Sequence, residues 1–386
     1  MQDLRRAIRV MDDFADRTGV TSSGPSTRYL WTDAFAVCNW LGLYEATGED
    51  RFLELCEALI EQVHEALGRH RSDDPRSGWI SGLPEAEGAR RPTAGGLRIG
   101  KPRPEKAPGE PYDPQAEWDR DGQYYHYLTR WMLALWRSWR VTGDAERYRQ
   151  AVDLARAAHA GFTTGAHGER RLVWKMSIDL SRPLVASSGH LDPLDGLVTS
   201  SLLVAGRPEG EPPDLLAAEL AELEEMCRGR SWVTDDPLGV GGLLVNALRC
   251  HQLAARGHAT GVRHLAEVVA DAGASLDALT GSRFAQQPPE RRLAFRELGL
   301  VIGLEAAVRM ENEEPLTDGP SDQTSTGDAV AAALGARAAS WRATGDEILD
   351  LWSREGNRRA PTWRGHRDIS EVMWATALHP RGFLDF

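Results

Sequence analysis

The sequence of 386 residues lacks the features of several large classes of protein. No uninterrupted apolar run reaches the roughly 18 residues that a membrane-spanning helix needs, so we expect no membrane segment. The net charge is -12 and no basic run or stripe occurs, which argues against binding to nucleic acid. Residues 1–16 are charged and periodic rather than basic and then apolar, so we expect no secretion signal and a cytoplasmic protein.

Cysteine is scarce, and recognised catalytic or ligand-binding motifs are missing. The four cysteines are widely spaced, form no C-x-x-C pair and fall within apolar helical runs, which predicts reduced core residues: Cys38, Cys56, Cys227 and Cys250. The chain contains no P-loop, no G-x-S-x-G elbow, no H-E-x-x-H helix and no Cys/His metal spacing. We therefore expect no cofactor and no metal, so any catalysis would depend on side chains alone.

Strand signals are also scarce, whereas apolar residues recur at i, i+3, i+4 and i+7 along nearly the whole chain. Two kinds of helical segment alternate. The amphipathic, charge-rich kind covers residues 3–17, 50–67, 144–160, 214–229, 262–279 and 328–353. The more apolar kind covers residues 32–46, 121–141, 191–205, 237–255, 292–310 and 367–378. Six of each predict one all-α domain over residues 1–386, an (α/α)6 barrel with apolar helices inside and amphipathic helices outside.

The connections between these segments are of two lengths. Short turns follow the apolar helices, as in Thr47-Gly48-Glu49 and Thr142-Gly143-Asp144, where glycine can end a helix in the left-handed conformation. Weaker copies occur at Gly206 and Gly257, and a third Thr-Gly-Asp, residues 344–346, falls inside the last amphipathic segment and leaves the pairing there open. Two connections are long, residues 68–119 and 161–190. We expect both to fold over the mouth of the barrel, either as functional loops or as surface insertions.

Acidic residues recur at the start of the apolar segments, where the barrel would bring them to one end. The candidate catalytic carboxylates are Asp119, Asp121, Asp195 and Glu297. The candidate substrate-binding residues are Trp31, Asp33, Trp118, Gln123, Tyr124, His126, His190, Arg296, Glu371 and Trp374. Carboxylates can perform acid/base chemistry and aromatic faces pack against the C–H faces of a pyranose, so the combination indicates a sugar-processing pocket. Each acid could instead cap its own helix.

One part of the chain resembles a known group of proteins. Trp31-Thr32-Asp33 and the stretch from Leu43 to Phe52, with its Leu-Tyr-x-x-Thr-Gly-acid turn, are similar to the opening of six-hairpin glycosidase-like proteins, in particular the unsaturated glucuronyl hydrolases. The resemblance implies an (α/α)6 barrel and an enzyme acting on carbohydrate, but the superfamily also includes sugar epimerases and polysaccharide lyases. Gly189-His190 resembles the N-acylglucosamine 2-epimerases, which use two histidines, and His126 is a candidate for the second.

Three functions follow from these patterns. The leading hypothesis is glycoside hydrolysis, with Asp119 or Asp121 as general acid and Asp195 or Glu297 as partner. The alternatives are a cofactor-free sugar 2-epimerase and a non-catalytic sugar-binding or scaffold protein. The expected partner is a small carbohydrate, and Arg98, Lys101 and Lys175 together with the positive ends of the inner helices would suit an anionic one.

Overall fold

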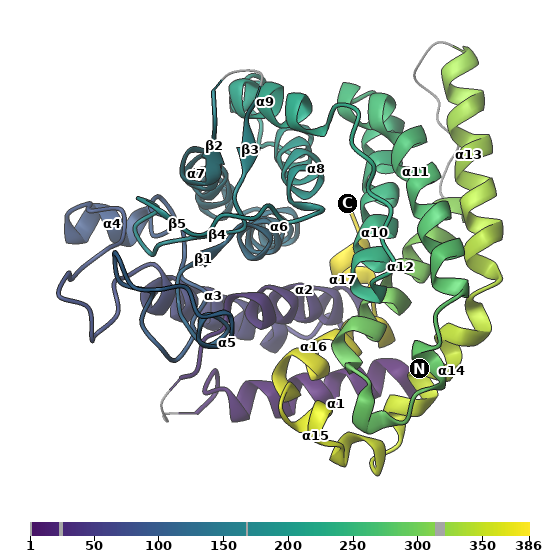
Figure 1. Cartoon of the computed structure of the whole chain (residues 1–386), viewed down its shortest axis with the longest axis horizontal. Helices are drawn as coiled ribbons and strands as arrows, with labels where there is room; N and C mark the ends of the chain where they lie inside the picture. Colours follow the sequence, from purple (N-terminus) through teal and green to yellow (C-terminus); the bar gives the residue numbers. More distant parts are fainter. Residues whose placement is uncertain (1, 23–25, 167–168, 313–320) are drawn as a thin grey trace. The chain divides into compact units, whose positions relative to one another are not determined.

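The computed structural model describes residues 2–22, 26–166, 169–312 and 321–386, and the chain is mostly helical (Figure 1). It divides into two compact units. Unit 1 consists of Met1–Phe14 and Gly229–Phe386, and unit 2 consists of Ala15–Arg228. None of the helices in the described ranges is both long and apolar enough to cross a membrane. All four cysteines are free and buried, as the sequence predicts.

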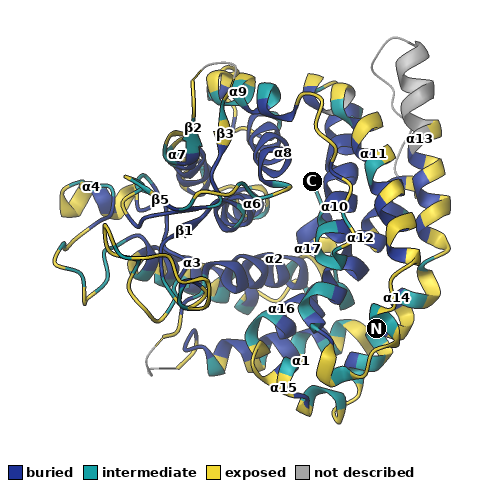
Figure 2. Ribbon diagram, in the orientation of Figure 1, coloured by how far each residue is buried: buried dark blue, intermediate teal, exposed yellow. Residues whose placement is uncertain are grey.

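Each predicted segment corresponds to helix, but the second apolar helix begins at Tyr125 rather than at residue 121, and the last amphipathic segment is divided in two. The apolar set forms α2 (Leu30–Thr47), α6 (Tyr125–Thr142), α8 (Asp192–Ala205), α10 (Pro237–Ala255), α12 (Ala294–Asn312) and α16 (Arg367–Leu378). The amphipathic set forms α1 (Gln2–Arg17), α3 (Arg51–Leu67), α7 (Ala145–Phe162), α9 (Ala217–Cys227), α11 (Ala259–Thr280), α13 (Ser321–Ala339) and α14 (Arg342–Ser353). The apolar helices are buried on almost every side, whereas α3, α9 and α14 each keep an exposed face (Figure 2).

In each unit the apolar helices lie side by side in chain order, and the amphipathic helices pack against them. In unit 2, α2 contacts α6 and α6 contacts α8, while α3, α7 and α9 each pack on the apolar helix that precedes them. In unit 1, α12 lies between α10 and α16, with α11, α13 and α14 packed against this row. The first residues of α1 also belong to unit 1, where the Arg6 guanidinium lies 5.9 Å from the ring of Trp374.

Glycine ends the apolar helices where the turn motif predicts it. Gly48 and Gly143 have φ angles of 71° and 76° and donate their backbone N–H groups to the carbonyls of Tyr44 and Trp139. Gly257 is also left-handed, with φ 70°, but Gly206 has φ -101° and is not. A glycine at a positive φ avoids the steric cost that a Cβ atom would add.

The last amphipathic segment differs from its prediction. Residues 328–353 were expected to form one helix, but the structure has two, α13 and α14, separated at residues 340–341. The Ser340 hydroxyl donates to the Arg337 carbonyl at 2.7 Å and so competes with the backbone hydrogen bonds that would continue the helix. The third Thr-Gly-Asp motif, residues 344–346, therefore lies inside α14 rather than in a turn.

The two long connections are built from short elements that join one another. The first connecting loop, residues 68–119, contains α4 (Glu85–Arg90) and α5 (Pro114–Glu117), and β1 (Gln123–Tyr124) follows it. The second connecting loop, residues 161–190, contributes β4 (Lys175–Met176) and β5 (Pro183–Val185). These strands form one antiparallel sheet in the order β1-β4-β5, which ties the second loop to the start of α6.

The remaining elements are short. A second sheet pairs β2 (Thr163–Thr164) with β3 (Arg171–Leu172). Unit 1 also contains two short helices, α15 (Pro361–Arg364) and α17 (Arg381–Leu384), and three turns of 3-10 helix, Phe284–Gln286, Pro289–Arg291 and Asn357–Arg359.

Candidate functional site

A group of aromatic rings lies where α2 and α6 begin in unit 2. We call this group, defined by its members, the aromatic cluster: Tyr29, Trp31, Tyr124, His126, Tyr127 and Trp174. Tyr29 and Tyr124 are the N-cap residues of α2 and α6. Because these helices are neighbours, their first turns meet, and the ring of Trp31 lies 5.8 Å from that of His126. The hydroxyls of Tyr29 and Tyr127 are 2.5 Å apart and share a hydrogen bond.

The second connecting loop supplies the last ring of this cluster. Tyr124 pairs with Lys175 across the β1–β4 sheet, which brings Trp174 against the cluster. Trp174 stacks on Tyr124 with ring centroids 5.0 Å apart, and Tyr124 stacks on His126 at 5.4 Å. The rings therefore form one packed wall that fixes the position of His126.

Charged groups from α6 and α8 lie next to this wall. We call them the acid–base cluster: His126, Arg130, Asp192 and Asp195. Arg130 donates to the Asp195 carboxylate at 3.0 Å, with its guanidinium 5.8 Å from the Trp31 ring. Asp192 Oδ1 is 3.8 Å from His126 Nδ1, slightly beyond hydrogen-bond distance. Both aspartates are buried and lie in the first turn of α8.

The environment of His126 lowers its pKa to about 4, mainly because burial disfavours the charged imidazolium. Asp195 opposes this shift and Arg130 adds to it. His126 is therefore neutral at physiological pH. In that state one ring nitrogen can accept a hydrogen bond and the other can donate one.

Two predicted site residues, Asp121 and Gln123, hold the first connecting loop in place. Asp121 is completely buried and accepts hydrogen bonds from Arg98 at 2.6 Å, from Arg71 at 3.3 Å and from two backbone N–H groups. Gln123, also completely buried, accepts from Leu97 N–H and donates to the carbonyls of Gly95 and Ile178. Side chains whose polar atoms are all occupied in this way are typical of structural anchors.

Trp118 and Asp119 differ from these anchors because both are exposed. Trp118 is 58% exposed, and its ring lies 6.4 Å from that of Trp174. Lys101 lies close by, with its Nζ 5.2 Å from the centre of the Tyr29 ring. Burial lowers the pKa of Lys101, and the negative charge of Asp119 opposes that shift.

Two further predicted residues of unit 2 occupy helix starts. Asp33 is buried in the first turn of α2, and its carboxylate accepts the backbone N–H of Tyr29 at 3.0 Å. This contact satisfies a backbone donor at the helix start. Asp33 therefore caps its own helix, the alternative to a substrate-binding role. His190 is exposed, two residues before α8.

The other four predicted residues belong to unit 1, where each has local partners. Glu297 is buried and accepts two hydrogen bonds from Arg292, at 2.7 and 2.8 Å, and one from Trp352 Nε1 at 2.9 Å. Arg296 pairs with Asp236, the N-cap of α10. The Glu371 carboxylate accepts from Arg367 at 2.8 Å, and Trp374 is buried, with Arg358 4.6 Å from its ring.

The sequence prediction missed several members of the two clusters. Tyr29, Tyr127, Arg130, Asp192 and Trp174 were not among the candidate site residues. Helical spacing offered a signal for two of them. Arg130 follows His126 by four residues and Asp192 precedes Asp195 by three, so each pair shares a helix face. Nothing in the sequence indicated that Trp174 would reach Tyr124, because that contact depends on strand pairing between distant segments.

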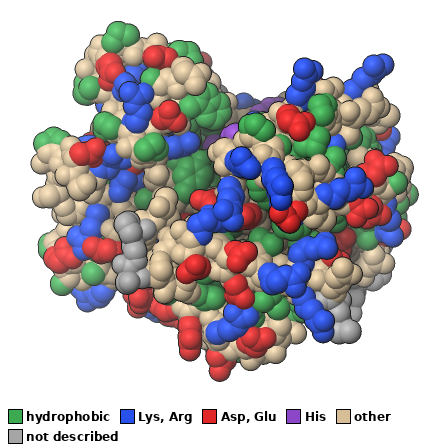
Figure 3. Space-filling model, turned by 90° about the horizontal axis from the view of Figure 1, so that it is seen from below, with side chains coloured by type: hydrophobic (Ala, Val, Ile, Leu, Met, Phe, Trp, Pro, Cys, Tyr) green, Lys and Arg blue, Asp and Glu red, His purple; other side chains and the backbone are tan. Residues whose placement is uncertain are grey.

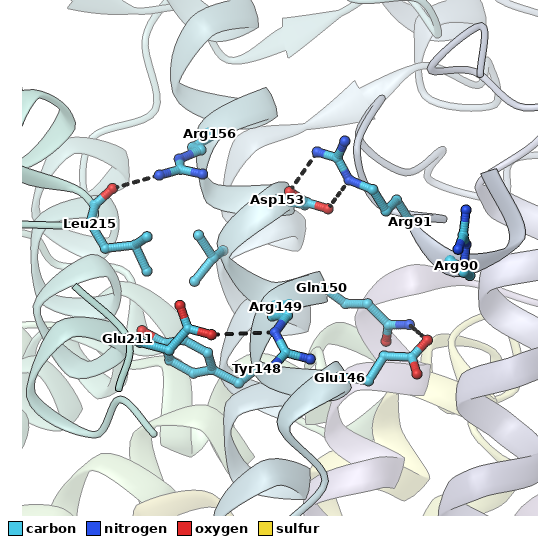
Figure 4. A pocket seen from close by; sticks show the side chains of 11 residues that line it. Arg90, Arg91, Glu146, Tyr148, Arg149, Gln150, Asp153, Arg156, Glu211 and Leu215 are labelled. Atoms are coloured by element: carbon cyan, nitrogen blue, oxygen red, sulfur yellow. Dashed lines mark hydrogen bonds and ion pairs between the residues drawn. The ribbon is translucent and has the colours of Figure 1, made fainter. Parts of the chain in front are cut away.

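The face of the molecule drawn in Figure 3 carries acidic and basic side chains interspersed with one another. A cavity of about 480 Å³ lies along α7, lined among others by Arg90, Arg91, Arg149 and Arg156 (Figure 4). Ion pairs of Arg91 with Asp153 and of Arg149 with Glu211 partly neutralise it. Within the described ranges, no group of three or more His, Cys, Asp or Glu side chains is arranged to hold a metal ion.

Comparison with known proteins identifies the fold. No protein-family model and no curated protein matches the sequence. Among solved structures, the chain is similar to that of a GH76 alpha-mannanase from Bacteroides thetaiotaomicron, with a TM-score of 0.54 and 8% sequence identity. The similarity covers 100% of this chain and 97% of that one. It confirms the predicted all-α fold of the (α/α)6-barrel class. At this identity the similarity shows fold alone.

Proposed function

We propose that the protein hydrolyses a glycosidic bond at the acid–base cluster, with the substrate packed against the aromatic cluster. One observation carries the proposal: the first turns of α6 and α8 place an arginine-bound carboxylate, a second carboxylate and a neutral histidine beside a wall of aromatic rings. Carboxylates in pairs are the usual catalytic groups of glycosidases, and aromatic rings bind the C–H faces of sugars.

Asp195 and Asp192 are the proposed carboxylate pair. Arg130 orients Asp195 and stabilises its negative charge, which suits a nucleophile or base. Asp192, three residues earlier on the same face of α8, is the proposed general acid. Residues at this spacing lie on one face of a helix with Cβ atoms about 5–6 Å apart, so both carboxyl groups can face the same substrate.

The remaining groups of the two clusters bind the substrate. Neutral His126 can accept a hydrogen bond from a sugar hydroxyl, because burial suppresses its protonation. Trp174, whose ring is half-buried, offers apolar surface against which a pyranose can pack, and Trp31 supports the wall from behind. In this proposal Asp121 and Glu297 hold the structure together, since all their oxygens already accept hydrogen bonds.

The test is a panel of oligosaccharides incubated with the protein, with detection of new reducing ends. The panel begins with α-mannooligosaccharides, because the structurally similar protein is named as an alpha-mannanase, and extends to β-linked and uronate-containing chains. We expect new reducing ends from at least one class, and NMR of the first product will show whether the anomeric configuration is retained or inverted.

Two results would overturn the proposal. One is the absence of new reducing ends across the panel. The other is incorporation of solvent deuterium at the carbon next to the carbonyl of a free sugar, without hydrolysis, which is the result expected of a 2-epimerase.

A further inference from the structure

Trp118 is an exposed aromatic residue beside rings that are buried or half-buried. More than half of its surface faces solvent, at 58%, whereas Trp31 and Tyr124 in the adjacent cluster are buried. Exposing a ring of this size leaves a large apolar surface in water, which the C–H face of a bound sugar would cover. Its neighbour in the chain, Asp119, is also exposed and presents a carboxylate beside the ring.

The backbone that carries Trp118 is held by a buried lysine. Lys175 is completely buried, and its ammonium group donates to the Glu117 carboxylate at 2.7 Å. The same group donates to the carbonyl of Glu117 at 3.1 Å and to that of Arg120 at 2.8 Å. One cation therefore binds the carbonyls on both sides of the Trp118–Asp119 pair.

A second segment fixes the same stretch from the other direction. The backbone N–H of Arg103 donates to the Asp119 carbonyl at 3.0 Å, and the Asp121 N–H donates to the Arg103 carbonyl at 2.8 Å. Residues 117–121 thus have their backbone groups engaged while the side chains of Trp118 and Asp119 point to solvent. A segment whose backbone is already ordered before its ligand arrives loses little backbone entropy on binding.

The exposed ring is also continuous with the proposed catalytic region. Trp118 contacts Trp174 edge to face at 6.4 Å, and Trp174 stacks on Tyr124 of the aromatic cluster. A chain of sugars bound at the acid–base cluster and extending along this wall would reach Trp118 with its outer units.

We propose that Trp118 and Asp119 form a distal sugar-binding platform that takes one pyranose unit of an oligosaccharide. The Trp118 face packs against the C–H groups of the sugar, and Asp119 accepts hydrogen bonds from its hydroxyls. The identity of the ligand as a sugar rests on the proposed function. If the platform binds a sugar unit, the substrate is an oligosaccharide rather than a single sugar with a small leaving group.

The test is calorimetric measurement of binding to the full chain carrying Asp195→Asn, so that the ligand is not consumed. The probes are α-mannotetraose, cellotetraose and xylotetraose, each compared with its monosaccharide. One of these tetrasaccharides is expected to bind. Adding Trp118→Ala to this background should raise its Kd by about 3- to 10-fold, which is the effect of losing one aromatic contact. Binding of the monosaccharide should stay unchanged.

Tyr112 provides a matched control, because it is an exposed aromatic residue of the same loop, at 53%, and lies outside the aromatic cluster. Tyr112→Ala should leave the Kd of every probe unchanged. Asp119→Asn keeps the size of the side chain and, like Trp118→Ala, should raise the Kd of the tetrasaccharide. Because both residues are exposed, their substitution should leave the melting temperature unchanged.

Three results would overturn the platform: no binding of any tetrasaccharide, equal binding with and without Trp118, or the same loss for monosaccharide and tetrasaccharide. Its failure is separable from that of the proposed function. Hydrolysis that persists unchanged in Trp118→Ala, with unchanged Kd, removes the platform alone. Trp118-dependent binding without any hydrolysis removes the hydrolase and keeps the platform.

Discussion

At the scale of single residues, the acids at or just before helix starts have two kinds of surroundings in this protein. Asp121 and Glu297 have all their oxygens engaged by arginine, tryptophan or backbone donors. Asp195 has an arginine partner too, but it lies beside a neutral histidine and an aromatic wall. The sequence could single out these acids as candidate catalytic groups, because each lies in a polar stretch at or just before a predicted apolar helix. It could not distinguish the two kinds of surroundings, since the partners of Asp121 lie 20 or more residues earlier in the chain.

Removal of the buried lysine should destabilise unit 2 strongly. Lys175→Met leaves the Glu117 carboxylate and two carbonyls without their donor in a buried site, and we expect a loss of about 3–5 kcal/mol in the free energy of unfolding. The measurement is urea-induced unfolding followed by circular dichroism. Lys106→Met, at a partly exposed lysine of the same loop, serves as the control and should change stability by under about 0.5 kcal/mol. A loss below about 1 kcal/mol for Lys175→Met would contradict the proposed role of Lys175 in holding Glu117 and Arg120.

His126 should titrate far below the ordinary range of histidine. An NMR titration of its ring resonances should give a pKa of about 4 in the wild-type protein, because burial disfavours the imidazolium. Arg130→Gln removes a cation that also lowers this pKa and frees Asp195 to attract the proton, so the pKa of His126 should rise in that variant. A wild-type pKa near 6.5 would show that the ring is more hydrated than the structure indicates.

At the scale of elements, the sequence predicted which segments are helical better than how the connections fold. Apolar periodicity and glycine turns were sufficient to place α2, α8, α10 and α16 within two residues of their observed ends. The break between α13 and α14 was missed because Ser340 interrupts the helix through one side-chain hydrogen bond and leaves the apolar pattern intact. The strands of the second connecting loop were missed because each has only two or three residues.

The two helix-ending glycines should each contribute measurably to stability. Gly48 and Gly143 are left-handed, and a Cβ atom at either position would meet no other atom within 4 Å, so substitution costs only backbone strain. We expect Gly48→Ala and Gly143→Ala each to lower the free energy of unfolding by about 1 kcal/mol. Gly356→Ala is the matched control, because that site is equally open and has φ -55°. Equal effects at all three positions in urea unfolding would contradict the account of the turns.

At the scale of the whole molecule, the fold could be predicted from the alternation of two helix types, and the similarity to a GH76 alpha-mannanase confirms it. The candidate site could be predicted only in part. Trp31, His126 and Asp195 were predicted as site residues from their places at helix starts, and the structure brings them together with Arg130. Contacts that depend on loops meeting in three dimensions, such as Trp174 on Tyr124, have no local signature.

Stability should decrease in mild acid because two histidines are held neutral in the folded chain. Burial lowers the pKa of His64 to about 3 and that of His126 to about 4, below the 6.5 of an unfolded chain. Below pH 6.5 the unfolded state therefore binds more protons, and stability falls as pH falls, by about 1.4 kcal/mol per pH unit for each histidine. Melting temperatures measured from pH 7 to pH 4 should decrease steadily, and His64→Gln should flatten the slope. A profile that is flat over this range would contradict the burial of both rings.

Asp195 is the proposed catalytic carboxylate, and the most direct test of this role is the turnover of the best oligosaccharide by Asp195→Ala. We predict a loss of about 100-fold or more in kcat, since a positioned acid or base contributes roughly that much or more, with partial recovery when formate or azide replaces the missing carboxylate. Circular dichroism of the variant should match that of the wild type. Turnover by folded Asp195→Ala at the wild-type rate would contradict the account.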